Sequence, residues 1–152
     1  TEADTVKESV TIKIKGDVGG DQGIMYRFAD GKYIAVRYQN NGGNYKVQYT
    51  MDTVFFSDGS LKGWTDFMMT DEEKQTFDAS GLDLTFIRDG DTFYTLLGDR
   101  LLDTAQLDGK YAEMSGVMGI MIWNGADVAF TYNHKTGADV IIPEQTQPDT
   151  AE

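Results

Sequence analysis

The stretch from Gly23 to Tyr49 constrains the fold more than any other part of the sequence. It contains three short runs of apolar, aromatic and β-branched residues, separated by clusters rich in Gly, Asn and Asp at 29–32 and 39–44. Such clusters supply the positive φ angles with which a strand reverses direction. The stretch therefore predicts three antiparallel strands joined in a meander.

The charge of Arg27 selects between two registers for the first hairpin. A two-residue loop at 30–31 would place Arg27 on the same face as the apolar residues of the next strand. A three-residue loop at 30–32 instead pairs Phe28 with Ile34 and leaves Arg27 on the opposite face. A one-residue slip exchanges the faces of a strand, and an unpaired buried Arg is strongly unfavourable, so we predict the second register. The predicted core face then holds Ile24, Tyr26, Phe28, Ile34, Val36 and Tyr38.

The opposite face of this meander is polar, basic and aromatic, which is the composition that a binding surface needs. A six-residue loop at 39–44 would pair Tyr38 with Tyr45 and bring two further polar residues to this face. The candidate ligand-binding residues there are Arg27, Tyr33, Arg37, Lys46 and Gln48. The alternative interpretation is that Asp residues on neighbouring strands hold the two arginines in a structural network.

Other segments predict further strands and one helix. Residues 9–15 alternate apolar and polar side chains, as a strand with one face in the core does. Thr70 and Glu73 match a capping box with acidic residues in the first turn, and the helix should run through Asp78 and stop near Gly81.

Two hairpins are predicted in the C-terminal half. One turns at Asp89-Gly90, pairs Phe86 with Phe93, and has the core residues Leu82, Leu84, Phe86, Phe93 and Leu97. The other joins 117–123 to 127–133 at Asn124-Gly125. Many short strands, turns rich in Gly, Asn and Asp, and a single short helix are typical of an all-β, two-sheet antiparallel β-sandwich. We expect a frayed segment at 1–8, the domain at 9–142, and a linker-like tail at 143–152.

Composition speaks against several classes of function. The net charge of −12 argues against nucleic acid and anionic membrane surfaces as partners. No apolar run is long enough to span a membrane, and no signal peptide pattern begins at Thr1. The chain has no cysteine, so it has neither disulfides nor thiolate ligands, and its single histidine, His134, is not enough for a His-based metal site.

The acidic turns lead us to expect a structural calcium site. The loop at 16–23 contains Asp17 and Asp21, whose oxygens are suitable ligands for a hard cation. The loop lacks the alternating-oxygen spacing of a dedicated calcium loop, so a plain flexible turn is the favoured interpretation of the loop itself. We expect calcium to raise the melting temperature modestly.

Three parts of the sequence, in order, resemble recurring motifs of the concanavalin A-like jelly-roll superfamily. Residues 23–28 and 33–37 resemble its "G-apolar-apolar-aromatic-Arg" and "Tyr-x-x-x-Arg" strands. Residues 82–90 and 98–101 are similar to its hairpin, although Gly98-Asp99 departs from the usual "D-G" turn. Residues 116–130 resemble its closing strand pair. The resemblance spans roughly Val10 to Tyr132 and implies a jelly roll.

The superfamily includes laminin G-like domains, legume-type lectins, glucanases and carbohydrate-binding modules. Its glucanases carry a Glu-x-Asp-x-x-Glu strand, because a retaining glycosidase needs two carboxyls about 5–5.5 Å apart. Nothing here matches that motif, and Glu72-Glu73 lies in the predicted helix cap. We predict a non-catalytic carbohydrate-binding domain of a larger secreted or cell-surface bacterial protein. A structural or protein-adhesion module without a sugar site is the alternative, followed by a glycoside hydrolase.

Three aromatic residues extend the predicted sugar site, since sugars stack their C–H faces on aromatic rings. Trp64 and Trp123 lie near turns and are candidate rim platforms, and Tyr94 joins the same outer face if its hairpin belongs to the same sheet. In the alternative interpretation Trp64 fills a sandwich edge, and Trp123 continues the alternation of Val117, Gly119 and Met121 into the core.

Overall fold

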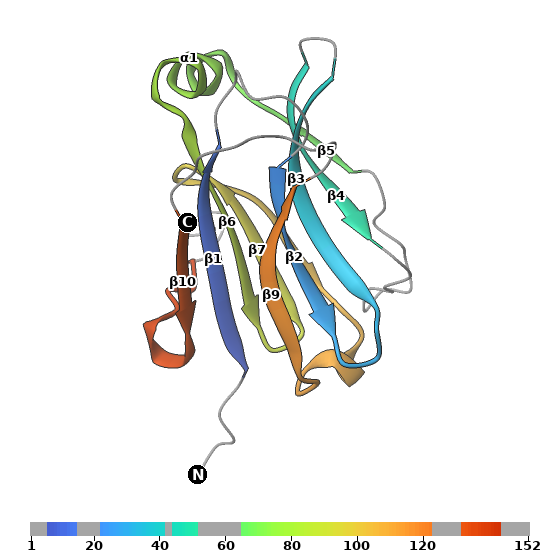
Figure 1. Ribbon diagram of the computed structural model, residues 1–152. Coiled ribbons are helices and arrows are strands. Elements are labelled where there is room, and N and C mark those ends of the chain that lie inside the picture. Colours follow the sequence, from blue (N-terminus) through green and yellow to red (C-terminus); the bar gives the residue numbers. More distant parts are fainter. Residues whose placement is uncertain (1–5, 15–21, 42–43, 52–64, 123–131, 144–152) are drawn as a thin grey trace, which may run out of the picture.

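The computed structural model describes residues 6–14, 22–41, 44–51, 65–122 and 132–143 (Figure 1). The strands are β1 (Lys7–Ile14), β2 (Gln22–Phe28), β3 (Tyr33–Asn41), β4 (Asn44–Met51), β5 (Asp66–Met68), β6 (Leu82–Asp89), β7 (Thr92–Leu97), β8 (Arg100–Gln106), β9 (Gly116–Ile122) and β10 (Tyr132–Thr136). Helix α1 spans Asp71–Ser80, and two 3-10 helices span Gly109–Tyr111 (η1) and Gly137–Asp139 (η2).

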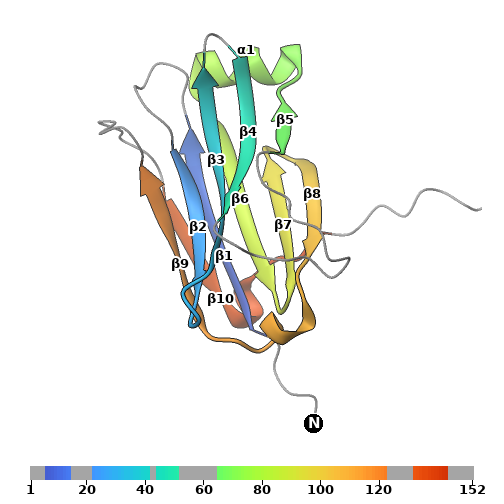
Figure 2. The ribbon, with the colours of Figure 1, turned by 90° about the vertical axis from the view of Figure 1, so that its right-hand side faces the viewer.

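These strands form two antiparallel five-stranded sheets that stack as a sandwich (Figure 2). The β1 sheet has the order β10-β1-β6-β7-β8, and the β3 sheet has the order β5-β4-β3-β2-β9. The chain changes sheet after β1, again through α1 between β5 and β6, and on both sides of β9. The predicted all-β sandwich with one short helix is therefore confirmed.

Apolar and aromatic side chains from both sheets fill the space between the layers. The predicted core faces of β1, of the meander and of the 82–97 hairpin are confirmed, with Leu82 only partly buried. The buried members of those faces are Val10, Ile12, Ile14, Ile24, Tyr26, Phe28, Ile34, Val36, Tyr38, Leu84, Phe86, Phe93 and Leu97.

The pairing within the meander differs from the predicted register by two residues. Tyr26 pairs with Ile34 instead of Val36, and the β3–β4 pairing shifts in the same way. The first loop has the predicted three residues, but it occupies 29–31, because Gly31 adopts φ 89° and supplies the left-handed residue that closes such a loop. A shift of two residues leaves every side chain on its predicted face.

The β6–β7 hairpin shows the same kind of shift. Phe86 pairs with Thr95 instead of Phe93, and the turn residues are Gly90 and Asp91. Gly90 adopts φ 62° at the first central position, where the type I′ and II′ hairpin turns both need a positive φ. In the sequence Asp-Gly-Asp, either Asp89-Gly90 or Gly90-Asp91 can form a two-residue turn. The prediction that Asp89-Gly90 forms it was wrong.

Two short helices close the ends of the sandwich. Thr70 caps α1 as predicted, since its side chain accepts from the Glu73 amide while the Glu73 carboxylate accepts from the Thr70 amide. Phe77 of α1 is buried and lies 4.6 Å from Tyr38, measured between ring centroids. At the other end, Tyr111 of η1 lies 4.6 Å from Phe28.

The predicted C-terminal hairpin is only partly within the described residues. Its first strand corresponds to β9, which pairs with β2. The described end of its second strand belongs to β10, which pairs with β1 in the other sheet. The expected turn at 124–125 lies outside the described residues.

One charged side chain lies inside the core. Arg88 has no solvent exposure, and its guanidinium donates to the Gly90 and Tyr111 carbonyls, each at 2.7 Å, and to the Tyr26 hydroxyl. It also stacks on the rings of Tyr26 and Phe28, 4.8 and 5.1 Å from their centroids. Arg88 therefore links the two sheets through polar contacts that the hydrophobic pattern did not predict.

Candidate functional site

The outer face of the β3 sheet carries the predicted polar and aromatic surface. Strand alternation places all five meander candidates on this face, opposite the buried side chains of β2, β3 and β4. The structure therefore places Arg27, Tyr33, Arg37, Lys46 and Gln48 on one face. Arg27 pairs with Tyr33 in one row across the strands, and Arg37 pairs with Gln48 in another, with the row of Met25 and Ala35 between them. Lys46 lies one row beyond Gln48 on β4.

The first row consists of Val117, Arg27 and Tyr33, on β9, β2 and β3. Arg27 pairs directly with both neighbours, so the three side chains stand side by side. Val117 is 70% exposed, Arg27 is exposed and Tyr33 is partly exposed. Within the described part of the chain, neither Arg27 nor Tyr33 makes a hydrogen bond or an ion pair. This row, which we call the Arg27 row, offers an unengaged cation and an unengaged phenol to solvent.

The second row consists of Arg37, Gln48 and Asp66, and its members are bonded to one another. Arg37 Nε and Nη2 donate to Gln48 Oε1 at 3.2 and 3.0 Å. Gln48 Nε2 donates to Asp66 Oδ1 at 2.8 Å, and Lys46 Nζ contacts Asp66 Oδ2 at 3.4 Å. Arg37 and Gln48 are buried. The network interpretation therefore applies to Arg37 and does not apply to Arg27.

Two glycines shape this face. A Cβ on Gly23 would come within 2.2 Å of the Val36 carbonyl oxygen and 2.9 Å of Arg37 Cβ, so only glycine lets β2 approach β3 this closely at Arg37. A Cβ on Gly119 would meet no atom within 4 Å. The surface beside the Arg27 row is therefore open at Gly119.

The other candidate residues do not join these rows. Tyr94 belongs to the β1 sheet, because its hairpin is β6–β7, and it is buried with Ile87 and Val140 on that sheet's outer face. Burial, followed by the charge of Asp89, raises the pKa of the Tyr94 phenol. Trp64 and Trp123 lie outside the described residues.

Sequence reasoning missed two members of the rows. Val117, Gly119 and Met121 were considered for the core, but Met118 is buried and Ile120 packs against the core, so the alternation is the reverse. Where every residue of a strand is apolar or glycine, the pattern cannot choose a face. Asp66 begins β5, and nothing in its local sequence indicates a bond to Gln48.

The described residues contain no group of three acidic or histidine side chains that could hold a metal ion. The two aspartates of the 16–23 loop lie outside those residues, and the calcium site stays a prediction. No described helix has the length and apolarity needed to cross a membrane.

No family model and no curated protein matches this sequence. Among solved structures, the carbohydrate binding module CBM66 from Bacillus subtilis matches with a TM-score of 0.52 and 14% identity, over 90% of this chain and 76% of that chain. This chain therefore shares the fold of that module, a two-sheet antiparallel β-sandwich. A mutant of the GH43 protein BlXynB from Bacillus licheniformis matches with a TM-score of 0.50 and 13% identity, over 90% of this chain and 28% of that one. Sheep galectin-11 in complex with glycerol matches with a TM-score of 0.49 and 10% identity, over 89% of this chain and 92% of that chain.

Proposed function

We propose that this domain binds carbohydrate on the outer face of the β3 sheet and catalyses no reaction. The observation that carries the proposal is the direct pairing of Arg27 with Tyr33, both accessible and both without a partner in the described part of the chain. The chain has 25 acidic and 13 basic side chains, so a basic side chain has many potential acidic partners within it. An unpaired Arg beside an unpaired Tyr therefore supports a ligand site.

The chemistry of the Arg27 row suits a sugar. A guanidinium offers five N–H donors to hydroxyl oxygens, and a tyrosine offers a ring face to C–H groups together with a hydroxyl. Three neighbouring strands span about 10 Å at the usual strand spacing of about 4.8 Å, which is the scale of one or two sugar rings. The open surface at Gly119 gives the ring room to lie flat.

The fold and the acid inventory are consistent with this proposal. CBM66 is by its name a carbohydrate binding module, and it shares the fold. Among the described residues of the β3 sheet strands, Asp66 is the only acid, and both of its oxygens are engaged. Glycoside hydrolysis generally needs two carboxyls, so this face favours binding over catalysis.

Affinity gel electrophoresis against a panel of polysaccharides, followed by a glycan array, tests the proposal. We expect Arg27→Ala and Tyr33→Ala each to weaken binding by about tenfold or more, while the free energy of unfolding stays within about 1 kcal/mol, as it does for most surface substitutions. Lys13→Ala on the opposite sheet is the matched control and should bind like the parent. If Arg27→Ala and Tyr33→Ala both bind as tightly as the parent, the sugar site is not on this face.

Arg37→Ala separates ligand contact from support. Because Arg37 is buried and bonded to Gln48, we expect this variant to lose stability, unlike Arg27→Ala. A protein-adhesion module is the second candidate function, because Val117 is 70% exposed within the same row. No retardation by any glycan, together with retained folding, would favour that alternative.

We further propose that the domain is part of a larger extracellular or cell-surface bacterial protein. The match to a bacterial module and to a stretch of a longer bacterial GH43 chain supports this context. Fractionation of a bacterial culture with an antibody against the domain tests it, and signal confined to the cytoplasmic fraction would contradict it.

A further inference from the structure

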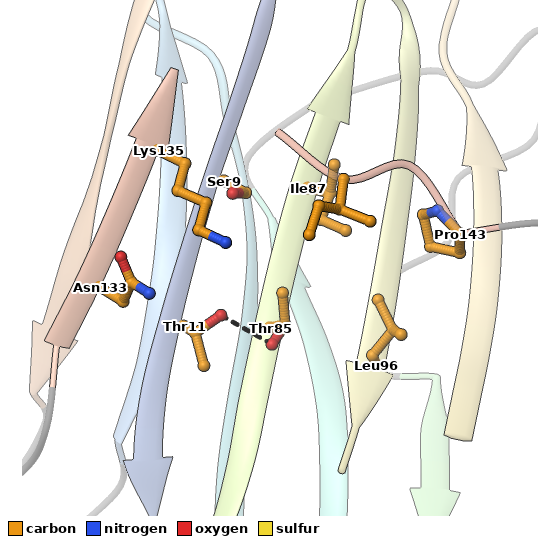
Figure 3. A pocket seen from close by; sticks show the side chains of 9 residues that line it. Ser9, Thr11, Thr85, Ile87, Leu96, Asn133, Lys135 and Pro143 are labelled. Carbon is orange, nitrogen blue, oxygen red and sulfur yellow. Dashed lines mark hydrogen bonds between the residues drawn. The ribbon is translucent and has the colours of Figure 1, made fainter. Parts of the chain in front are cut away.

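The outer face of the β1 sheet contains a cavity of about 230 Å³ (Figure 3). This face lies on the other side of the sandwich from the proposed sugar-binding face of the β3 sheet. Strands β1 and β6 form its floor, β10 forms one side, and the segment that follows η2 forms another. The described lining residues are Ser9, Thr11, Thr85, Ile87, Leu96, Asn133, Lys135, Ile141 and Pro143.

The floor of the cavity carries three hydroxyl groups. Thr11 and Thr85 pair across β1 and β6, and their Oγ1 atoms are 2.8 Å apart. Ser9 is 6% exposed, and within the described residues its hydroxyl has no hydrogen-bond partner. This hydroxyl lines the cavity and is available to bond a ligand or water.

Lys135 is the only charged side chain among the described lining residues. Its ammonium makes no ion pair there, although the chain has 25 acidic and 13 basic residues. Figure 3 shows the side chain reaching from β10 toward the hydroxyl floor. A partly buried, unpaired ammonium above hydroxyl groups is a site for an anionic oxygen, which both kinds of donor can bond.

The opposite side of the cavity is aliphatic. Ile87 is 4% exposed on the floor, and Leu96, Ile141 and Pro143 complete the apolar wall. No aromatic ring stands among the described lining residues, so the cavity lacks the stacking surface that a sugar uses. An aliphatic group suits this wall because its burial removes apolar surface from water.

We propose that this cavity binds a small carboxylate with an aliphatic body, such as a short-chain fatty acid. The carboxylate accepts from Lys135 and from the Ser9 and Thr11–Thr85 hydroxyls, and the aliphatic body packs on Ile87, Leu96 and Ile141. The cavity is smaller than the roughly 300–1,000 Å³ of drug-sized sites, which limits the ligand to a short chain. This site is independent of the sugar face on the other sheet.

Titration of the folded protein with hexanoate, 1-hexanol and hexylammonium, followed by amide chemical shifts, tests the proposal. We expect hexanoate to saturate in roughly the millimolar range, as ligand efficiency allows for so small a molecule. Hexanol should bind about tenfold or more weakly, hexylammonium more weakly still, and the shifts should map to β1, β6 and β10.

Lys135→Met keeps the stem and removes the charge, so it should make hexanoate and hexanol equivalent. Lys13→Met is the matched control, because Lys13 lies on the same face but is paired with Asp83 at 3.2 Å, and it should preserve the preference. Ile141→Asn, at a position 71% exposed and therefore safe for folding, should weaken both ligands. Equal binding of acid and alcohol by the parent, an unchanged preference in Lys135→Met, or no saturation by hexanoate would each overturn the proposal. Loss of sugar binding alone would not affect it.

Discussion

Replacing Arg88 with Met measures what a buried guanidinium contributes to this sandwich. The substitution removes three donors and leaves the Gly90 carbonyl, the Tyr111 carbonyl and the Tyr26 hydroxyl without their partner. Each buried acceptor without a partner costs about 1–3 kcal/mol of stability. Removing the buried charge also removes its desolvation penalty, which offsets part of this loss. We therefore expect the free energy of unfolding to fall by about 3–5 kcal/mol, the range for breaking a buried charged contact.

Urea unfolding followed by circular dichroism provides the assay. With an m-value of about 1–3 kcal/mol/M, the expected loss lowers the midpoint by about 2 M. Arg88→Lys keeps the charge but not the planar fork, so it should lose most of the same stability. Lys13→Met, at an exposed ion pair, should change stability by no more than about 0.5 kcal/mol. A loss below about 1 kcal/mol for Arg88→Met would refute the reasoning, because the bonds would then only offset the burial of the charge.

Two further predictions concern Gln22 and Glu73. Gln22 is fully buried and neither end of its amide has a partner within the described residues, so Gln22→Met should raise the free energy of unfolding by about 1–3 kcal/mol in the same urea assay, and a decrease would indicate a bridging water. Burial raises the pKa of Glu73, but hydrogen bonds from Arg100 and Thr70, with the charge of Arg100, lower it more, so the net pKa lies below its ordinary 4.5. The stability from ionised Glu73 is therefore present above pH 4.5 and lost as the pH falls through the lowered pKa, so the deficit of Glu73→Gln should shrink on acidification; a deficit independent of pH would contradict this assignment.

The sequence predicted the faces of the strands better than their pairings. Side-chain alternation has a period of two residues, so a shift of two residues changes a partner but not a face. The pairing depends on which residue of a turn takes the left-handed conformation. Gly31 ends its loop and Gly90 begins its turn, and the neighbouring aspartates give no local signal that distinguishes these positions.

The candidate site was predictable where a local pattern fixes the face of a strand and unpredictable where the answer depends on distant parts of the chain. The outward placement of Arg27 and Tyr33 was predictable because burial of Arg27 is unfavourable, and this single argument oriented the three strands of the meander. The same argument would have wrongly placed Arg88 on the surface. The cost of burying its charge is offset by hydrogen-bond acceptors from β2 and η1, which are remote in sequence. The place of Tyr94 depended on which sheet receives the β6–β7 hairpin, and local pattern does not encode that choice.

The position of Pro143 has a consequence for how the domain can be presented. Pro143 lies at the cavity on the β1 sheet, whereas the Arg27 row lies on the outer face of the β3 sheet. Stacked sheets are separated by about 10 Å, so the body of the sandwich stands between these two places. An anchor attached directly at Pro143 would therefore hold the domain on the side of the β1 sheet. Arg27 and Tyr33 would point away from the support, toward whatever polymer lies in front of it.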